Sequence, residues 1–220
     1  MTASDFWHLL LSFPKTLRFN LHYFPLKIAW KLPVVVSYRV LLRALEGKVI
    51  LPDNVTTAMI KIGFGDVGHY DRKRLRSIWQ VTGTVTFLGK ASIGHGSKLS
   101  VRGDLTLGAD FNMTAESTIV CAHKIFFGND NLLSWEILVM DTDEHPLYNK
   151  EEVRINPDKP IVVGNHVWIG CKCILLKGTV VPDNTVIAAG TLLKHSFTGE
   201  NQVIGDNPPR IMKREVRWEH

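Results

Sequence analysis

The chain of 220 residues has no apolar run close to the roughly 20 residues that a membrane-spanning helix needs. It also shows no small-residue cleavage site after its short N-terminal apolar stretch, which argues against a secretory signal. Its few cysteines (Cys121, Cys171 and Cys173) are odd in number and lack metal-type spacing. We therefore interpret them as reduced thiols of a cytoplasmic protein. The net charge of +5, from 26 Lys+Arg and 21 Asp+Glu, is too small for a nucleic-acid-binding surface but suits an anionic ligand or a membrane surface.

What the chain does have is a six-residue repeat between Val163 and Leu192. Large aliphatic residues start successive hexads, and four positions after each comes a small or β-branched residue: Val163, Ile169, Leu175, Val181 and Ile187, followed by Val167, Cys173, Thr179, Thr185 and Thr191. An α-helix cannot place every sixth residue on one face, and a simple strand repeats every two residues. A short strand and a tight corner, repeated, fit the pattern. The hexads therefore predict an all-β fold, a parallel β-helix whose coils bury their apolar side chains by stacking.

The repeat divides the chain into parts. Residues 1–32 are predicted to form a helical extension, interrupted near Pro14 and Pro25. Residues 33–193 form the β-helix, with irregular hexads before residue 140, and residues 194–220 form a polar C-terminal tail. The segment 141–160 abandons the repeat, and such an excursion from a rigid scaffold is a common position for functional residues.

The excursion opens with the sequence Asp141-Thr142-Asp143-Glu144-His145-Pro146. A histidine can take a proton from a nucleophile near neutral pH, because its unperturbed pKa lies in that range. A nearby carboxylate can fix its tautomer, which gives the base and orienting group of acyl-transfer chemistry. Taken alone, the pair means little, and a solvated loop histidine is the better interpretation of it.

Several motifs together give these residues a context. They are Phe127-Gly128-Asn129-Asp130, the His145 motif, Trp168-Ile169-Gly170, Leu176-Lys177-Gly178, Ile187-Ala188-Ala189-Gly190-Thr191 and Gly205-Asp206-Asn207-Pro208-Pro209-Arg210. In this combination the chain resembles the hexapeptide-repeat acyltransferases, and most closely the O-acetyltransferases of polysaccharide biosynthesis. The family usually reads Gly-Asn-Pro-Ala near its end, whereas this chain inserts Asp206 and has Pro209 at the small position.

The resemblance implies a left-handed β-helix that assembles as a homotrimer and transfers an acetyl group from acetyl-CoA to a hydroxyl of a sugar or lipid-linked sugar. His145 matches the catalytic histidine, Asp143 is the candidate for orienting it, and Asp141 is the reserve. The backbone N–H of Gly170 is a candidate donor to the oxyanion. The residues expected to bind the coenzyme are Trp168, Gly170, Ala189, Gly190, Lys194, Arg210 and Lys213. Neither a metal nor a nucleic acid is expected.

Other interpretations stay open. An amino-sugar amine is an alternative acceptor, because the same base serves both, and a non-catalytic β-helical assembly subunit is an alternative role. β-Helices that resemble gamma-class carbonic anhydrases need three zinc-binding histidines, two of them about five residues apart, and the nine histidines here include no such pair. Trp168 could instead plug a corner, and Lys194, Arg210 and Lys213 could only solvate the tail.

The N-terminal segment interleaves aromatic and aliphatic residues with basic ones. Phe6, Trp7, Phe13 and Trp30 alternate with Lys15, Arg18, Lys27 and Lys31, among others. Such a segment either caps the open end of the β-helix or makes peripheral contact with a membrane.

Overall fold

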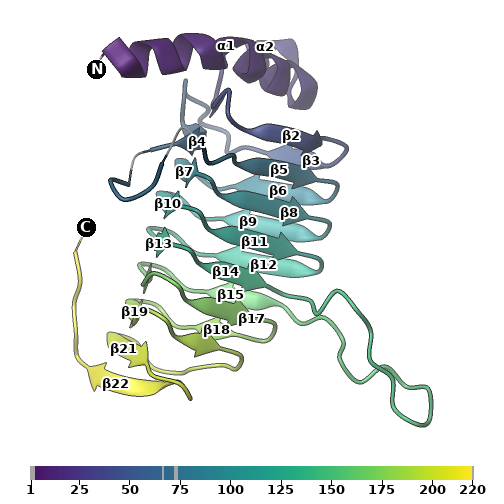
Figure 1. The fold of residues 1–220 in the computed structure, drawn as a ribbon, viewed down its shortest axis with the longest axis vertical. Helices are drawn as coiled ribbons and strands as arrows, with labels where there is room; N and C mark the ends of the chain where they lie inside the picture. The colour runs from purple at the N-terminus through teal and green to yellow at the C-terminus, as the bar shows by residue number, and fades with distance from the viewer. Residues whose placement is uncertain (1–2, 66, 72–73, 220) are drawn as a thin grey trace.

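The computed structural model describes residues 3–65, 67–71 and 74–219, so that the outermost residues of the two predicted terminal segments, 1–2 and 220, lie outside it. Two helices, α1 (Ala3–Tyr23) and α2 (Leu26–Ala29), lie across one end of a stack of strands (Figure 1).

The strands form three sheets, here called sheets 1, 2 and 3. Sheet 1 contains β1 (Val34–Val36), β4 (Ile60–Phe64), β7 (Ala91–His95), β10 (Phe111–Ala115), β13 (Leu132–Trp135), β16 (Trp168–Ile169), β19 (Thr185–Ile187), β21 (Gln202–Gly205) and β22 (Arg210–Arg214). Sheet 2 contains β2 (Leu41–Ala44), β5 (Ile78–Val81), β8 (Lys98–Val101), β11 (Thr118–Cys121), β14 (Leu138–Met140), β17 (Ile174–Leu176) and β20 (Leu192–Leu193). Sheet 3 contains β3 (Lys48–Ile50), β6 (Thr84–Phe87), β9 (Asp104–Leu107), β12 (Lys124–Phe127), β15 (Ile161–Val163) and β18 (Val180–Val181).

The order of the strands shows how the chain winds. From β1 to β17, each strand pairs in parallel with the strand three places further along the chain, as β10 does with β13 and β11 with β14. Each circuit of the three sheets is therefore one coil, and the fold is the parallel β-helix that the hexads predicted. The last two pairings differ. Strand β19 pairs in parallel with β21, two places further on, and β22 turns back antiparallel to β21.

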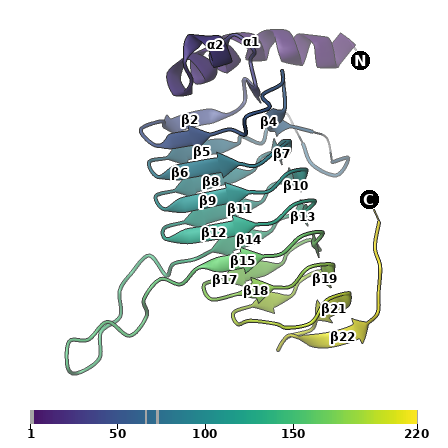
Figure 2. The same cartoon turned by 180° about the vertical axis from the view of Figure 1, so that it is seen from behind.

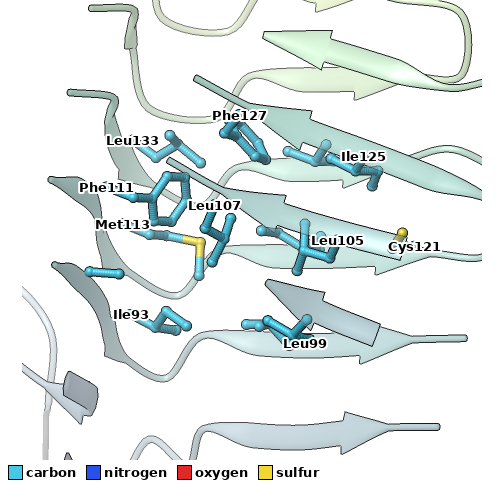
Figure 3. Close-up of a cluster of buried hydrophobic side chains, with 14 of the residues drawn as sticks. Ile93, Leu99, Leu105, Leu107, Phe111, Met113, Cys121, Ile125, Phe127 and Leu133 are labelled. Atoms are coloured by element: carbon cyan, nitrogen blue, oxygen red, sulfur yellow. The ribbon is translucent and has the colours of Figure 1, made fainter. Parts of the chain in front are cut away.

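The interior of the stack is a continuous apolar column. All five hexad starters and the five small residues that follow them are buried, as predicted. The irregular hexads before residue 140 also point inward, with Ile93, Leu107, Met113 and Phe127 fully covered. Figure 3 shows these side chains aligned from coil to coil, with the Phe111 and Phe127 rings in edge-to-face contact at 5.1 Å between centroids. Such rows form because each coil can bury its apolar face only against its neighbours.

Coil length explains why the repeat is regular only near the end of the chain. In sheet 2, Lys98 pairs with Thr118 and Thr118 with Leu138, so that a coil there takes 20 residues. After the excursion Ile174 pairs with Leu192, which is a coil of 18 residues, or three hexads. The two additional residues in each earlier coil produce the irregular spacing.

Helix α1 closes the first coil through hydrogen bonds. Asn20 donates to the carbonyl of Val34 at 2.6 Å and accepts from its N–H at 3.2 Å, while the Thr16 hydroxyl bonds both backbone groups of Val36, at 2.9 and 3.2 Å. These side chains take the place of a neighbouring strand at the exposed edge of β1. The expected interruption near Pro14 is wrong, because α1 continues through it. Pro14 is exposed, so that the carbonyl it leaves without an N–H donor can bond water.

Two segments leave the stack. The excursion departs between β14 in sheet 2 and β15 in sheet 3 and projects far from the body (Figures 1 and 2). The C-terminal tail turns at β22 and runs back along the outside of the stack (Figure 2).

Candidate functional site

The base of the excursion is fixed by Asp141. Its carboxylate is fully buried and accepts the backbone N–H groups of Ala122, His123 and Lys124 at 2.7, 2.9 and 2.7 Å. The first residue of the excursion is therefore tied to the corner of the preceding coil. Since these bonds occupy both carboxylate oxygens, Asp141 anchors the loop. It does not orient His145, the role for which it was the reserve candidate.

His145 lies on the excursion with an exposed side chain. Asp143, the expected orienting residue, directs its carboxylate elsewhere: Oδ2 accepts from Lys177 Nζ at 2.5 Å and from Asn156 Nδ2 at 2.8 Å. The contact between Asp143 and His145 runs through the backbone, where the His145 N–H donates to the Asp143 carbonyl at 2.6 Å. Asp143 thus shapes the turn that carries His145 and leaves its imidazole exposed.

Asn156 connects the two arms of the excursion. Its Nδ2 donates to the carbonyl of His145 at 2.9 Å as well as to Asp143, and its Oδ1 accepts the N–H of Leu147 at 2.6 Å. Lys177, at a corner of the following coil, also donates to the carbonyl of Asn156 at 3.0 Å. These contacts hold the backbone on both sides of His145 against the stack.

A further contact ties the excursion to the preceding coils. Arg102 forms a two-fold ion pair with Glu144, with N–O distances of 3.1 and 3.0 Å. Glu144 is therefore held by Arg102 of an earlier coil, and Asp143 is held by Lys177 of the following coil.

The electrostatics of this turn favour the ionised form of Asp143. The hydrogen bond from Lys177, and after it the one from Asn156, lowers the pKa of the Asp143 carboxyl below its usual range. Its interactions with Lys177 and Asn156 are accordingly fully formed at neutral pH.

Trp168 lies on the outward face of β16 and is 38% exposed, as its position before a hexad starter predicted. Its Nε1 donates to Ser134 Oγ at 3.2 Å. Trp218, from the C-terminal tail, lies beside it with 6.1 Å between the ring centroids and stacks on His166 at 4.2 Å. The C-terminal tail therefore packs beside Trp168 through the Trp218 ring.

The small residues expected near the coenzyme fall into two kinds. The N–H of Gly170 donates to the carbonyl of Ile187 at 2.8 Å, so that the expectation that it serves the oxyanion is wrong. A Cβ at Gly170 would come within 2.7 Å of the Ala189 nitrogen, which gives this glycine a packing role. Ala189 and Gly190 are exposed, and a Cβ at Gly190 would meet no atom within 4 Å. This corner leaves room for a ligand to approach the backbone.

The three basic residues expected to bind the coenzyme differ in whether an ion pair is formed. Lys194 and Lys213 are exposed, whereas Arg210 Nε pairs with Asp206 Oδ2 at 2.6 Å. Asp206 is the residue that this chain inserts relative to the usual family pattern, and the ion pair gives the insertion a structural task. The same turn is held by Asn207, which bonds the N–H of Leu192 at 3.0 Å and the carbonyl of Gly190 at 3.1 Å.

One chain does not bring the predicted site residues together. His145 and Asp143 lie on the excursion at the junction of sheets 2 and 3, whereas Trp168 lies on sheet 1. In Figure 2 the excursion projects from the side of the stack opposite to β19, β21 and the C-terminal tail. A site that used both groups would need residues from two chains.

Two kinds of feature are absent from the described ranges. Residues 3–65, 67–71 and 74–219 contain no group of three or more His, Cys, Asp or Glu side chains placed to hold a metal ion. Neither helix of that same part of the chain is sufficiently long and apolar to span a bilayer.

Comparison with known proteins gives relatives of one kind. The chain is 35% identical over 128 residues to a polysialic acid O-acetyltransferase of Neisseria meningitidis, covering 58% of this chain and 57% of the relative. It is 29% identical over 113 residues to the galactoside O-acetyltransferase of Escherichia coli, covering 50% and 54%. This chain therefore spans little more than half the length of these relatives. No protein-family profile matches the chain.

A solved structure shows the same fold. The polySia-specific acetyltransferase NeuO superposes with a TM-score of 0.59 and 21% identity, over 82% of this chain and 72% of that one. The fold is thus the left-handed parallel β-helix, and the relatives confirm the resemblance to hexapeptide-repeat acyltransferases.

The sequence did not point to three residues that contact the candidate site residues. Asn156 lies within the excursion and carries no motif. Lys177 belongs to a motif that supported the resemblance, but it had no expected role. Trp218 is a large aromatic residue within a polar, basic tail, and that contrast was a usable signal.

Proposed function

We propose that this chain, a relative of bacterial O-acetyltransferases with their β-helical fold, transfers an acetyl group from acetyl-CoA to a hydroxyl of a sugar in cell-surface polysaccharide biosynthesis. The observation that carries the proposal is the anchored excursion. Five polar contacts of Asp143, Asn156 and Lys177 fix the turn around His145, while its ring stays exposed. A loop histidine of no consequence would not need such support.

His145 acts as the general base in this proposal. It removes the proton of the acceptor hydroxyl as that oxygen forms a bond to the acetyl carbonyl carbon. The C–S bond then breaks, and the protonated imidazole returns the proton to the leaving thiolate, which gives an acetyl ester and free coenzyme A. The histidine ends the cycle neutral, so that no other proton acceptor is required.

Acetyl-CoA supplies the activated acetyl group, and the residues of this chain fit such a ligand. The exposed indole of Trp168 and the open corner at Ala189 and Gly190 offer an apolar surface with close access to the backbone. Lys194 and Lys213, both exposed, offer positive charge for phosphate groups, and Arg210 adds to it while paired with Asp206.

We further infer a homotrimer with its active sites between neighbouring chains. The distance between the excursion and sheet 1 within one chain supports this, since only another chain can bring the two groups together. Beyond Leu147, the excursion exposes three large apolar side chains, Tyr148, Val153 and Ile155, which suit contact with a neighbour. The cytoplasmic location is supported by the three cysteines, none of which forms a disulfide.

Calorimetric titration of the whole protein with acetyl-CoA tests the proposal first. Micromolar-range binding that weakens in Trp168→Ala, followed by coenzyme A release on addition of a sugar, is the expected result. Acceptors that differ only in a hydroxyl or an amine at one carbon distinguish O-acetylation from N-acetylation. A folded trimer that binds no acetyl-CoA would contradict the proposal and favour a structural assembly role.

A further inference from the structure

The outer surface of the two N-terminal helices is apolar. Of the 19 large hydrophobic side chains exposed in the described residues, nine lie between residues 6 and 30. We call them the N-terminal apolar face: Phe6, Trp7, Leu9, Leu10, Leu11, Phe13, Leu21, Leu26 and Trp30. Trp7 and Trp30 are more than half exposed, at 60% and 68%. Exposed apolar side chains gathered in this number on two neighbouring helices indicate a site of interaction.

Capping the β-helix does not account for this face. The side of α1 that meets the stack carries Ser12, Thr16 and Asn20, spaced by four residues and buried. These three bond the backbone of residues 34–38, and Lys15 donates to the carbonyls of Tyr38 and Val40 at 2.6 and 2.5 Å. An ordinary surface helix would bury its apolar stripe and expose its polar side. Helix α1 buries Phe19 against Trp79 beside these polar side chains, but most of its large apolar side chains point away from the stack and remain available for a further contact.

The charge of the protein is concentrated at the same end. Residues 1–50 contain seven Lys+Arg and two Asp+Glu, a net charge of +5. The remaining 170 residues contain 26 − 7 = 19 basic and 21 − 2 = 19 acidic residues, which leaves no net charge. Arg18, Lys27 and Lys31 are exposed within or beside the two helices. Apolar and aromatic side chains bordered by basic ones are typical of helices that lie in the interface of an anionic membrane.

The shape of this end suits a flat partner. In Figures 1 and 2, α1 and α2 lie across the end of the stack, and the excursion projects from its other half. A planar surface can therefore contact the N-terminal apolar face without meeting the coils. A second copy of the chain would instead bring two ends of net charge +5 together, which electrostatic repulsion disfavours.

We propose that the N-terminal apolar face binds the surface of an anionic phospholipid bilayer. Helices α1 and α2 lie in the plane of the interface with Trp7 and Trp30 among the inserted side chains. Arg18, Lys27 and Lys31 contact lipid headgroups, and the β-helix stands away from the membrane. The contact does not depend on acetyl transfer.

Flotation of the full-length protein with phospholipid vesicles tests this proposal. We expect the protein to float with vesicles that contain phosphatidylglycerol in phosphatidylcholine, and to float less as salt is raised. With phosphatidylcholine alone most of the protein should stay in the dense fraction. Failure to float with the anionic vesicles at low salt would overturn the proposal.

Two sets of variants separate the apolar and basic contributions. The double change Trp7→Ser with Leu10→Ser should abolish flotation, whereas Leu88→Ser with Val162→Ser, exposed residues on the coils, should leave it unchanged. Reversing Arg18, Lys27 and Lys31 to Glu should weaken binding more than roughly a hundredfold, from about fivefold for each basic group removed. Replacing Lys61, Lys90 and Lys124, which are also exposed, by Glu makes the same change in net charge and serves as the control.

The charge-reversal variant leaves the buried polar side of α1 intact, so that it tests binding even if the apolar variant folds poorly. Equal losses in the two charge-reversal variants would overturn the proposal. A second outcome would also overturn it: light scattering shows that trimers of the unchanged protein pair, the double variant Trp7→Ser with Leu10→Ser does not pair, and neither of these two proteins binds vesicles.

Discussion

The stack and the excursion are held together by different kinds of contact. The stack buries rows of aliphatic and aromatic side chains, with Leu107, Phe127 and Leu175 fully covered. The excursion buries almost no apolar surface and depends on polar contacts at Asp143, Asn156 and a few neighbours. The stack therefore determines the stability of the protein, and the excursion can be altered at little cost to it. Substitutions in the two regions should separate stability from catalysis.

The largest effect is expected at His145. Replacement of this residue by alanine should lower turnover by roughly 10²–10⁴-fold, the range typical of a general base, because the acceptor hydroxyl then has no group to take its proton. The side chain is exposed, so that the urea midpoint should stay unchanged. Steady-state kinetics and calorimetry with acetyl-CoA check this. A large loss of coenzyme affinity, with turnover intact, would contradict the role given to His145.

The same leucine substitution in both regions tests the comparison directly. Leu107→Ala leaves a cavity in the buried column and should lower the free energy of unfolding by about 2–5 kcal/mol. Leu147→Ala, on the exposed excursion, should change it by less than about 0.5 kcal/mol. Urea denaturation of the two variants measures the difference, and similar midpoints would show that the excursion contributes to the stability of the stack.

Asn156→Ala should sharpen the comparison within the excursion. The change removes the bonds to Asp143, His145 and Leu147, so that turnover should fall by roughly ten- to hundredfold through misplacement of the base. Asn149→Ala is the matched control, since its side chain bonds only Glu151 and Val153 near the tip of the loop. Amide hydrogen exchange around residues 143–147 should quicken in Asn156→Ala alone. Unchanged exchange there would exclude Asn156 as a positioning residue.

The smallest effect is a dependence on pH at Asp143. The contacts with Lys177 and Asn156 lower the pKa of the Asp143 carboxyl below its usual value. These contacts therefore stabilise the folded loop fully at any pH above the usual pKa, and they are lost only as the pH falls through the lowered pKa. The side-chain amide resonance of Asn156 should therefore stay constant from neutral pH down to the usual range of an aspartic acid and shift below it. In Asp143→Asn no such shift should occur, and a shift that persists there would assign the titration to another group.

The sequence predicted the regular part of the fold well and the polar contacts poorly. The hexads from Val163 onward place every inward residue correctly, because their coils contain three complete hexads. The prediction for α1 failed at Pro14, since helix-breaking tendencies act locally while the bonds of Thr16 and Asn20 to the first coil hold the helix in place.

The site shows the same limit. His145 and Trp168 were singled out because each belongs to a motif, and Trp168 points outward as its place in the hexad predicted. The role of Asp143 required knowledge of Lys177, which lies 34 residues further along the chain and comes close only because the coils stack. Partners of this kind depend on register between coils, which spacing in the sequence does not reveal.

The register of the strands on both sides of the excursion has an evolutionary consequence. Ile125 pairs with Ile161 and Leu132 with Trp168, so that the coil resumes in phase after 20 residues spent outside the stack. Insertions or deletions within this loop therefore need not disturb the scaffold. Under the proposed function, acceptor preference can diversify by changes in loop length and sequence alone, while selection for folding acts on the coils.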